Sequence, residues 1–365
     1  MARIMMMTTE EKGHLNPMIP VAQALLARGH HVGWLSIPEP ADALRQVGVE
    51  VVKCLPPPGP EHITDGEELA RLVRDKLALR GWIQSLLIDS VPAWIEPLMR
   101  SFKLFGPEAL VVDPMLYQGI IVSHKLDVPW VGVSSSLNPI TPPNWQSDII
   151  DNVRALSPRR EALFAEYGLQ PDFRVCDCLS PYGNTVFSTA EYVGEQAMPS
   201  KTYLVGPSIP RGPRGDECPL PWHRLRDGKP LIYASFGSQI SWQPDVFSRI
   251  AMAVDDADLV ISAGDLVGTA WADSLPANVI AVPYTPQHAL LERAQVLITH
   301  GGANSAMEAL YHGVPMLLSP VCNDQFHQAR FAKTRGVAVI LDLYEATDAE
   351  IGAALHTLQN DGDIA

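Results

Sequence analysis

Four groups of residues that could together bind one long polar ligand occur between Tyr284 and Gln325. The segment begins with an aromatic residue beside a Pro-Gln pair and continues with a His-Gly-Gly run, an Asn, a Ser, a lone Glu and an Asp-Gln pair. Aromatic rings stack on bases, glycine-rich turns bind phosphates, and carboxylates accept hydrogen bonds from sugar hydroxyls. In this order the groups predict a pocket for a base, a diphosphate, a ribose and a sugar, which together make a nucleotide sugar.

The His-Gly-Gly run that begins at His300 is the part best suited to a diphosphate. It follows a strand-like apolar run and precedes a helical pattern. Glycines at such a turn let backbone N–H groups approach phosphate closely, and a helix N-terminus attracts anions. His300, Asn304 and Ser305 can each donate a further hydrogen bond at the same place.

Glu308, three residues after Ser305, has two possible roles. Its carboxylate can accept hydrogen bonds from ribose hydroxyls one turn into the helix. Alternatively, Ser305 and Glu308 form a capping box that only begins the helix. The neighbouring His300 and glycines favour the ligand-binding role, because a capping box needs neither.

The two ends of the segment are ambiguous when each is taken by itself. Tyr284 follows an apolar run and could stack on a base, or it could be a buried core tyrosine. Asp324 and Gln325 follow the strand-like run 316–319, which suits a ligand with many hydroxyl groups but also an ordinary polar loop. The residues alone leave both alternatives open at each end.

A second place for chemistry lies in the amino half, around His14. Pro17 is well placed near a helix start, so His14 should project from the carboxyl end of the first strand. A histidine there can act as a general base near neutral pH. Asp113 follows the apolar run 109–112, and an aspartate on the far ring nitrogen would orient such a histidine. Alternatively, Asp113 is a turn residue before Pro114.

Strand-like apolar runs alternate with helical patterns along the chain, which predicts βαβ units and parallel sheets. In the amino half the expected strands are 2–8, 31–36, 50–54, 109–112, 128–134 and 185–188, with a helix at 18–28. In the carboxyl half the expected strands are 230–235, 258–262, 279–282, 296–299 and 316–319, with a helix at 348–358. Ligands of such sheets bind at the carboxyl ends of the strands.

Residues 207–230 interrupt this alternation with repeated prolines, glycines and charged residues. Such a composition is typical of a linker between domains. We therefore predict two doubly wound α/β domains, residues 1–206 and 230–365, joined by a linker at 207–229. The chain stops soon after its last helical segment, so we also expect the second domain to lack its last helix.

Composition and charge exclude several classes of function. The chain has 365 residues, enough for two cores, and a formal net charge of −14 at pH 7. This charge argues against nucleic acid as a partner and against docking on anionic lipid through a basic patch. No apolar run reaches the length of a membrane span, and the first residues read as a buried strand, so we expect a cytoplasmic protein.

The sequence does not predict a metal site. Of its five cysteines, Cys176 and Cys178 form a C-x-C pair, but no second pair has metal-ligand spacing. Reduced thiols are therefore expected. Asp256 and Asp258 imitate a metal-binding D-x-D pair, yet they lie at a helix-to-strand joint, where a solvated turn is expected.

Residues 284–325 closely resemble the signature of the family 1 glycosyltransferases, the UDP-glycosyltransferases of GT-B fold. The W-x-P-Q, H-x-G, N-S-x-x-E, G-V-P and D-Q elements are matched almost throughout, with Tyr284 where plant members have tryptophan. Residues 235–238 resemble the family's S-F-G-S turn, and residues 13–17 resemble its G-H-x-x-P catalytic loop. The resemblance, which is to the bacterial natural-product type, therefore extends over both halves of the chain.

This resemblance implies two Rossmann-like domains that face each other across a cleft, the first binding the acceptor and the second the nucleotide sugar. It implies His14 as the catalytic base and Asp113 as its partner. In the family the aromatic residue and the Pro-Gln glutamine bind uridine, His, Asn and Ser bind diphosphate, Glu binds ribose, and Asp and Gln bind the sugar. The donor-binding residues carried over are Ser238, Tyr284, Gln287, His300, Gly302, Asn304, Ser305, Glu308, Asp324 and Gln325.

The reaction implied is that of an inverting hexosyltransferase. A sugar, which we expect to be glucose, would pass from a UDP-sugar to a hydroxyl of a lipophilic flavonoid, macrolide, polyketide or terpenoid, giving a β-glycoside. Glu308 favours UDP over dTDP, and the Asp324-Gln325 pair favours glucose. The UDP-sugar is a co-substrate, no metal or other cofactor is implied, and we expect a monomer or weak dimer.

The acceptor site is the least specified part of the sequence. Aromatic and thioether side chains suit an apolar pocket, and the candidates are Trp82, Trp94, Met115 and Trp145, with loops at 56–81 and 137–151. The alternatives to a transferase are a non-catalytic nucleotide-sugar-binding module and another GT-B enzyme, such as a nucleotide-sugar epimerase or a phosphorylase. A dinucleotide dehydrogenase is not expected, because no G-x-G-x-x-G follows the first strand.

Overall fold

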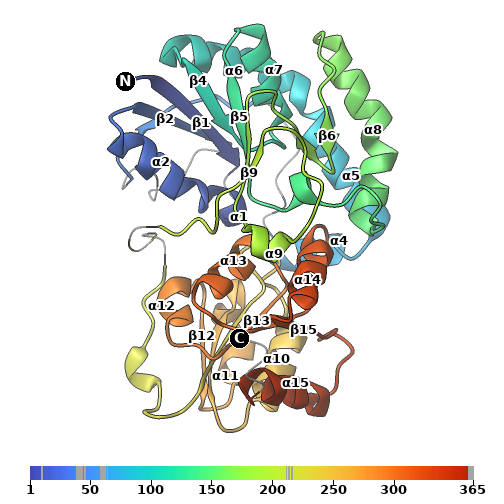
Figure 1. Cartoon of the computed structure of the whole chain (residues 1–365). Helices are drawn as coiled ribbons and strands as arrows, with labels where there is room; N and C mark the ends of the chain where they lie inside the picture. The colour runs from blue at the N-terminus through green and yellow to red at the C-terminus, as the bar shows by residue number, and fades with distance from the viewer. Residues whose placement is uncertain are drawn as a thin grey trace. The chain divides into compact units, whose positions relative to one another are not determined.

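The computed structural model describes residues 1–9, 11–37, 44, 47–57, 63, 65–210, 212, 214 and 217–360. The chain divides into two compact units: unit 1 comprises Met1–His62 and Asp75–Gly215, and unit 2 comprises Ile63–Arg74 and Asp216–Ala365. Each unit is built on one large parallel sheet covered by helices (Figure 1). The predicted α/β class, with two doubly wound parallel sheets, is confirmed.

The large sheet of unit 1 has seven strands within the described residues, in the order β3-β2-β1-β4-β5-β8-β9. All of its neighbouring strands are parallel. The strands are β1 (Arg3–Thr9), β2 (His31–Ile37), β3 (Glu50–Val51), β4 (Ala109–Val112), β5 (Trp130–Ser134), β8 (Asn184–Val186) and β9 (Thr202–Leu204). A separate antiparallel pair consists of β6 (Phe173–Arg174) and β7 (Asp177–Cys178). The strand order reverses between β1 and β4, which makes this edge the place for a ligand.

Helices cover both faces of this sheet, as the alternation of side chains along β1 shows. Met5 and Met7 belong to a buried cluster with residues of α6 (Val91–Phe105) and α7 (Tyr117–Lys125), whereas Met6 belongs to a cluster with residues of α2 (Met18–Ala27). The helices of unit 1 are α1 (Lys12–Leu15), α2 (Met18–Ala27), α5 (Lys76–Gln84), α6 (Val91–Phe105), α7 (Tyr117–Lys125), α8 (Asp148–Glu166) and α9 (Ala190–Val193). Shorter turns are the π-helix Ser85–Asp89 and the 3₁₀-helix Asn138–Ile140.

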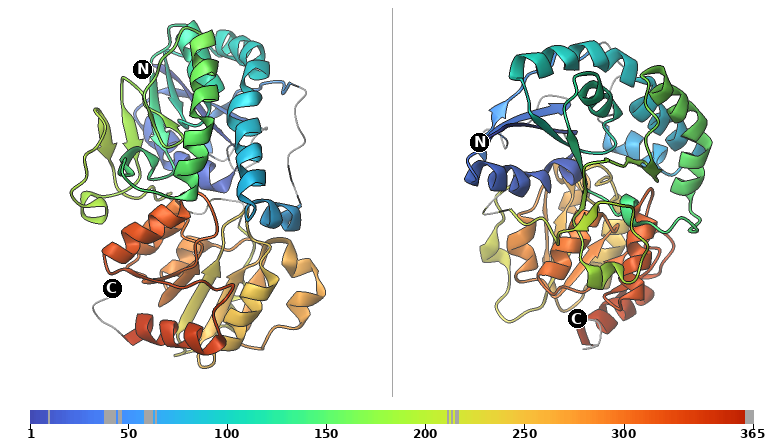
Figure 2. Two further views of the ribbon diagram at one scale, coloured as in Figure 1. Left: turned by 90° about the vertical axis from the view of Figure 1, so that its right-hand side faces the viewer. Right: turned by 45° about the horizontal axis from the view of Figure 1, so that its top comes forward.

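The long helix α8 lies beside α5 (Figure 2). Lys76 Nζ contacts Asp148 Oδ1 at 2.5 Å, and Arg80 Nε donates to Asn152 Oδ1 at 3.0 Å. Ser147 caps α8 by accepting from the Ile150 N–H at 3.4 Å. These contacts hold the first turns of α8 against α5.

The sheet of unit 2 has six strands in the described residues, in the order β12-β11-β10-β13-β14-β15, all parallel. The strands are β10 (Leu231–Ser235), β11 (Asp258–Ser262), β12 (Val279–Val282), β13 (Val296–Thr299), β14 (Met316–Leu318) and β15 (Ala338–Ile340). Every residue of β10, β11 and β13 is buried, as expected for central parallel strands covered on both faces. Here the order reverses between β10 and β13.

The helices of unit 2 include one that comes from the amino half of the chain. They are α4 (Gly66–Leu72), α10 (Pro244–Ala253), α11 (Ala270–Asp273), α12 (Gln287–Leu291), α13 (Ala303–Tyr311), α14 (Gln325–Thr334) and α15 (Asp348–Asn360), with 3₁₀ turns at Trp222–Arg224 and Gly264–Gly268. Next to α4, the Arg74 guanidinium lies 4.1 Å from the centre of the Tyr344 ring and donates to Gln243 Oε1 at 3.2 Å. The segment 63–74, which the sequence places within the domain 1–206, therefore groups with unit 2.

Most expected strands are present within one or two residues of their predicted ends. The strand expected at 50–54 is limited to Glu50–Val51, and the strand expected at 128–134 begins at Trp130. The strands β6, β7, β9 and β15 were not predicted, because runs of two or three residues carry no periodic signal. Residues 211, 213, 215 and 216 of the predicted linker and the end of the chain, 361–365, lie outside the described residues. Within the described residues, no helix is long and apolar enough to cross a membrane.

Candidate functional site

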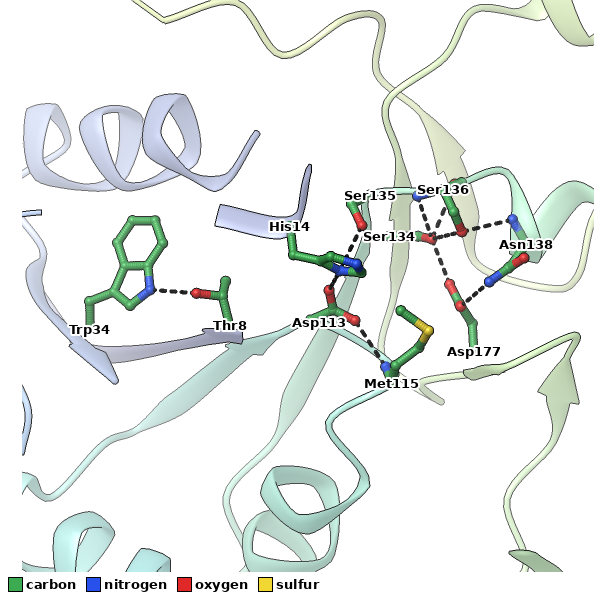
Figure 3. Close-up of polar contacts among 10 residues, drawn as sticks. All are labelled: Thr8, His14, Trp34, Asp113, Met115, Ser134, Ser135, Ser136, Asn138 and Asp177. Atoms are coloured by element: carbon green, nitrogen blue, oxygen red, sulfur yellow. Dashed lines mark hydrogen bonds and ion pairs between the residues drawn. The ribbon is translucent and has the colours of Figure 1, made fainter. Parts of the chain in front are cut away.

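The predicted catalytic pair lies at the switch point of the first sheet. His14 is in α1, directly after β1, and Asp113 directly follows β4. Because β1 and β4 are paired in parallel, the two segments leave the sheet next to each other. Trp34 Nε1 donates to Thr8 Oγ1 at 3.0 Å, and both side chains are buried, so the end of β1 is fixed just before His14 (Figure 3).

His14 and Asp113 are in direct contact. His14 Nδ1 lies 2.5 Å from Asp113 Oδ2, and Asp113 Oδ1 accepts from the Met115 N–H at 3.0 Å. The Asp113 side chain is 3% exposed, whereas the His14 side chain is 26% exposed. With its Nδ1–H donated to the carboxylate, the imidazole carries its basic lone pair on Nε2. This is the arrangement of a general base held by a buried acid.

A serine that the sequence did not single out also reaches the histidine. Ser135 follows β5, and its Oγ lies 3.0 Å from His14 Nδ1 (Figure 3). β5 is paired with β4, so the carboxyl ends of three neighbouring strands supply the three side chains. The signal in the sequence is weak: three consecutive serines, 134–136, end a strand-like run.

A second buried carboxyl group, Asp177, lies close to this pair and was not predicted either. It is 1% exposed and accepts from Ser134 Oγ at 2.5 Å and from Asn138 Nδ2 at 2.7 Å. Burial raises the pKa of Asp177 to about 7, and the two hydrogen bonds oppose this increase. The nearby Asp113 raises this pKa further, whereas His14 lowers it.

In unit 2, His300 directly follows β13, and its ring faces the turn after β10. The Phe236 ring stacks on it with centroids 6.3 Å apart. A Cβ on Gly302 would lie 2.7 Å from His300 Nε2, and a Cβ on Gly237 would lie 3.0 Å from His300 Cε1. The ring fits only because both neighbours are glycines. Burial lowers the pKa of His300 from 6.5 to about 4, so the ring is neutral near pH 7 and can donate one N–H without carrying a charge.

A network of side chains connects the Pro-Gln pair to α13. Gln287 Nε2 donates to Glu308 Oε2 at 2.6 Å and approaches Ser305 Oγ at 3.4 Å. Gln287 Oε1 accepts from the buried Tyr233 hydroxyl at 2.9 Å. The helix α13 begins at Ala303 with Gly302 as its N-cap and no side-chain cap. The capping-box alternative is therefore wrong, because Ser305 and Glu308 both lie inside the helix.

The other residues expected around the base and the diphosphate are accessible to different degrees. Ser238 is exposed, and Asn304 in the first turn of α13 is partly buried. Tyr284 is also partly buried, so it is not a fully buried core residue. Its carbonyl accepts from the Cys218 N–H at 2.8 Å, which holds the strand end that carries the ring.

Asp324 and Gln325 differ in their surroundings. Asp324 is the partly buried N-cap residue of α14 and makes no side-chain capping bond. Gln325 is 7% exposed, and its Oε1 accepts from the N–H groups of Val321 at 2.8 Å and Cys322 at 3.1 Å. The Gln325 side chain therefore holds the loop after β14, a role that the sequence did not predict.

The candidates for an acceptor pocket are dispersed over unit 1. Met115 adjoins the pair through its bond to Asp113. Trp94 packs against the buried cluster that includes α6 and α7, which fits the core alternative. Trp82 on α5 and Trp145 before α8 are partly buried. Of the expected acceptor loop 56–81, residues 58–62 and 64 lie outside the described residues.

Other polar groups with metal-ligand chemistry are engaged elsewhere. Asp256 pairs with Lys229, and Asp258 Oδ1 accepts from Arg226 Nε at 2.7 Å, so the D-x-D pair binds two cations of the protein. All five cysteines are free thiols. Among the described residues, no three His, Cys, Asp or Glu side chains are grouped so that they could hold a metal ion.

Comparisons with known proteins agree in the class of protein they find. The family model described as UDP-glucoronosyl and UDP-glucosyl transferase matches residues 226–363. Demethyllactenocin mycarosyltransferase of Streptomyces fradiae is 26% identical over 88% of this chain and 71% of its own length. NDP-glycosyltransferase YjiC of Bacillus subtilis is 25% identical over 99% of this chain and 90% of its own. The crystal structure of the glycotransferase of kitacinnamycin superposes with a TM-score of 0.76 at 22% identity, covering 100% of this chain and 92% of that one.

Proposed function

Because the chain belongs to the family 1 glycosyltransferases of GT-B fold, we propose that it transfers a sugar from a UDP-sugar to a hydroxyl of a lipophilic natural product. The observation that carries the proposal is the pair of His14 Nδ1 and Asp113 Oδ2, 2.5 Å apart at the switch point of the first sheet. A module that only bound a nucleotide sugar would have no use for a base held by a buried acid. The pair therefore supports transfer over mere binding.

The proposed reaction is a single displacement. His14 Nε2 accepts the proton of the acceptor hydroxyl. The electron pair that this frees on the hydroxyl oxygen forms a bond to the anomeric carbon. The bond from that carbon to the diphosphate oxygen breaks, and its electron pair leaves with the nucleoside diphosphate. Asp113 stabilises the imidazolium that forms. One displacement inverts the anomeric centre, so an α-linked donor gives a β-glycoside.

Hydrogen-bond donors of unit 2 would stabilise the negative charge on the leaving diphosphate. His300, Asn304, Ser305 and Ser238 can donate hydrogen bonds there, together with the N-terminus of α13. The neutral state of His300 supports a role as a hydrogen-bond donor, because a neutral ring can donate an N–H to the diphosphate without the cost of burying a charge of its own. We propose that transfer requires no metal and no other cofactor.

For the donor we propose UDP-glucose. The support for a ribonucleotide is the carboxylate of Glu308, which is 3% exposed and fixed by Gln287, and which can accept from both ribose hydroxyls. The support for glucose is the Asp324-Gln325 pair after β14. The name of the Bacillus subtilis relative specifies a nucleoside diphosphate without its base, so donors with other bases are the competitors in the assay.

The test is transfer by the purified protein in a panel of nucleotide sugars and hydroxylated aglycones, read by product mass and by nucleoside diphosphate release. We expect a mass increase of one hexose with at least one macrolide, polyketide, flavonoid or terpenoid. His14→Ala should abolish transfer while UDP binding, measured by calorimetry, stays nearly unchanged. Undiminished transfer by that variant would remove His14 from the mechanism. Tight UDP binding with no product from any acceptor would favour a binding module.

A further inference from the structure

The segment 134–138 is bound at both ends by one buried carboxyl group, that of Asp177. Asp177 Oδ2 accepts from Ser134 Oγ at 2.5 Å, and Asp177 Oδ1 accepts from Asn138 Nδ2 at 2.7 Å. Asn138 Oδ1 is buried and has no partner among the described residues, so the amide is oriented through Asp177. Asp177 therefore fixes both ends of a five-residue segment, as Figure 3 shows.

The middle of the same segment reaches the catalytic histidine. Ser135 Oγ lies 3.0 Å from His14 Nδ1, on the edge of the ring that also faces Asp113. Inside the segment, the Asn138 N–H donates to Ser136 Oγ at 3.2 Å. A shift of either end would therefore move Ser135 relative to the imidazole.

The hydrogen bonds of Ser134 depend on the protonation state of Asp177. Ser134 has one hydroxyl proton but three acceptors in reach: Asp177 Oδ2 at 2.5 Å, the Ser136 carbonyl at 3.1 Å and Ser136 Oγ at 3.2 Å. When Asp177 is ionised, the carboxylate takes this proton. When Asp177 is protonated, the acid donates to Ser134 Oγ, and the Ser134 proton turns to the carbonyl or the hydroxyl of Ser136. The two states thus give two hydrogen-bond patterns next to Ser135.

The charged groups around Asp177 connect it to the catalytic pair. On one side are His14 and Asp113, with opposite effects on its pKa. On the other side lies Cys178, a buried thiol that interacts with Arg160, Asp172 and Asp177. Because interactions between titrating groups are reciprocal, a charge on Asp177 must favour the protonated form of His14.

We propose that Asp177 is a positioning residue of the catalytic site, which holds Ser135 at His14 through Ser134 and Asn138 and whose negative charge stabilises the imidazolium of His14. The inference rests on the proposed function only for its effect on transfer. The contacts and the charge coupling exist whether or not the protein transfers a sugar. The substitution Asp177→Asn keeps the size of the side chain and removes the charge, so it imitates the protonated state at every pH.

The first test does not require activity. NMR titration of histidine side chains, with His14→Ala used to assign the resonance, gives the titration curve of His14. In the wild type we expect a second inflection near pH 7, where Asp177 ionises, and in Asp177→Asn a single inflection at a lower midpoint. Asp172→Asn, which removes an exposed charge outside the segment, is the matched control and should leave the curve unchanged. Superimposable curves for the wild type and Asp177→Asn would overturn the proposal.

The second test uses the ratio of wild-type to Asp177→Asn kcat/KM as a function of pH. We expect a ratio close to 1 at about pH 5.5, rising to about threefold at about pH 8.5, since a stronger base accelerates proton transfer only fractionally. A purely structural role would give a ratio that does not change with pH, and this result would refute the charge effect. Ser134→Ala keeps the carboxyl group but removes the link, and it should lower kcat more than it changes KM.

The two proposals fail in different ways. If the wild type transfers no sugar but the His14 titration depends on Asp177, the proposed function fails and the positioning role stands. If the wild type is active and Asp177→Asn matches it at every pH, the positioning role fails alone. Thermal unfolding of each variant shows whether it is folded, and if Asp177→Asn does not fold, Ser134→Ala tests the link between Asp177 and Ser135.

Discussion

Replacement of Gly302 by alanine should disable the diphosphate site through one steric contact. Gly302 has φ −60° and ψ 139°, which alanine adopts without strain, so the backbone tolerates the change. The added Cβ would lie 2.7 Å from His300 Nε2, whereas ordinary contacts begin at 3.4 Å, so the ring must move by about 0.7 Å. Gly237 lies against the same Cε1–Nε2 edge of the ring and Phe236 stacks on its face, so both limit its movement.

The size of the effect follows from the displacement of a hydrogen-bond donor in a preorganised site. Misplacement of about 1 Å typically costs about 100-fold in rate, or about 2.7 kcal/mol of transition-state stabilisation. We therefore expect Gly302→Ala to lower kcat/KM by about 100-fold, measured by nucleoside diphosphate release at saturating acceptor. Gly268→Ala is the matched control, because a Cβ there meets nothing within 4 Å.

A double-mutant cycle decides whether the loss passes through His300. In a His300→Ala background the alanine at position 302 has no ring to displace, so Gly302→Ala should cost little beyond the His300→Ala substitution. An equal loss in both backgrounds would refute the reasoning, because the effect would then come from another contact. Wild-type kcat/KM in Gly302→Ala would refute it as well.

Three further outcomes are expected. Glu308→Gln should weaken UDP binding about tenfold and reduce the preference for UDP over dTDP, as calorimetric titration with each nucleotide would show. An unchanged preference would mean that Glu308 does not bind the ribose hydroxyls. Because the pKa of His300 is lowered to about 4 from 6.5, the unfolded chain binds more protons between these values, and stability is lost as the pH falls through this range. In urea unfolding at several pH values, His300→Gln should remove up to about 3 kcal/mol of this loss, and parallel curves for the two proteins would contradict the assignment. EDTA should leave transfer unchanged, and activity that is lost with EDTA and restored by Mg²⁺ would contradict the proposed metal-free mechanism.

Local sequence signals were enough for the strands that carry the site. β4, β11 and β13 have the predicted ends, because central parallel strands are continuous apolar runs with turn residues on both sides, and the edge strand β12 has the predicted ends as well. Very short elements escaped prediction: β7 has two residues, Asp177–Cys178, and no pattern distinguishes it from a loop. The sequence did not predict a role for Asp177 for this reason.

The position of segment 63–74 also could not be derived from the sequence. Nothing in its composition separates it from the rest of the amino half, yet it groups with unit 2. Its place depends on Arg74, which contacts Gln243 and the Tyr344 ring. Such contacts join residues far apart in the chain, and residue types alone do not specify which pairs will meet.

The sequence by itself determined the class of protein and the residues worth examining. The spacing around His300 and Glu308, and the strand ends before His14 and Asp113, are local patterns that one chain displays directly. The tertiary structure decided which of these residues meet and in what state. It brings Asp113 to His14 through the pairing of β1 with β4, adds Ser135 and Asp177 from other strands, and uses the oxygen of Gln325 to hold a loop. It also buries Asp177 and partly buries His300, and so moves their pKa values in opposite directions, because removal from water disfavours the charged form, which is the deprotonated form of an acid and the protonated form of a base.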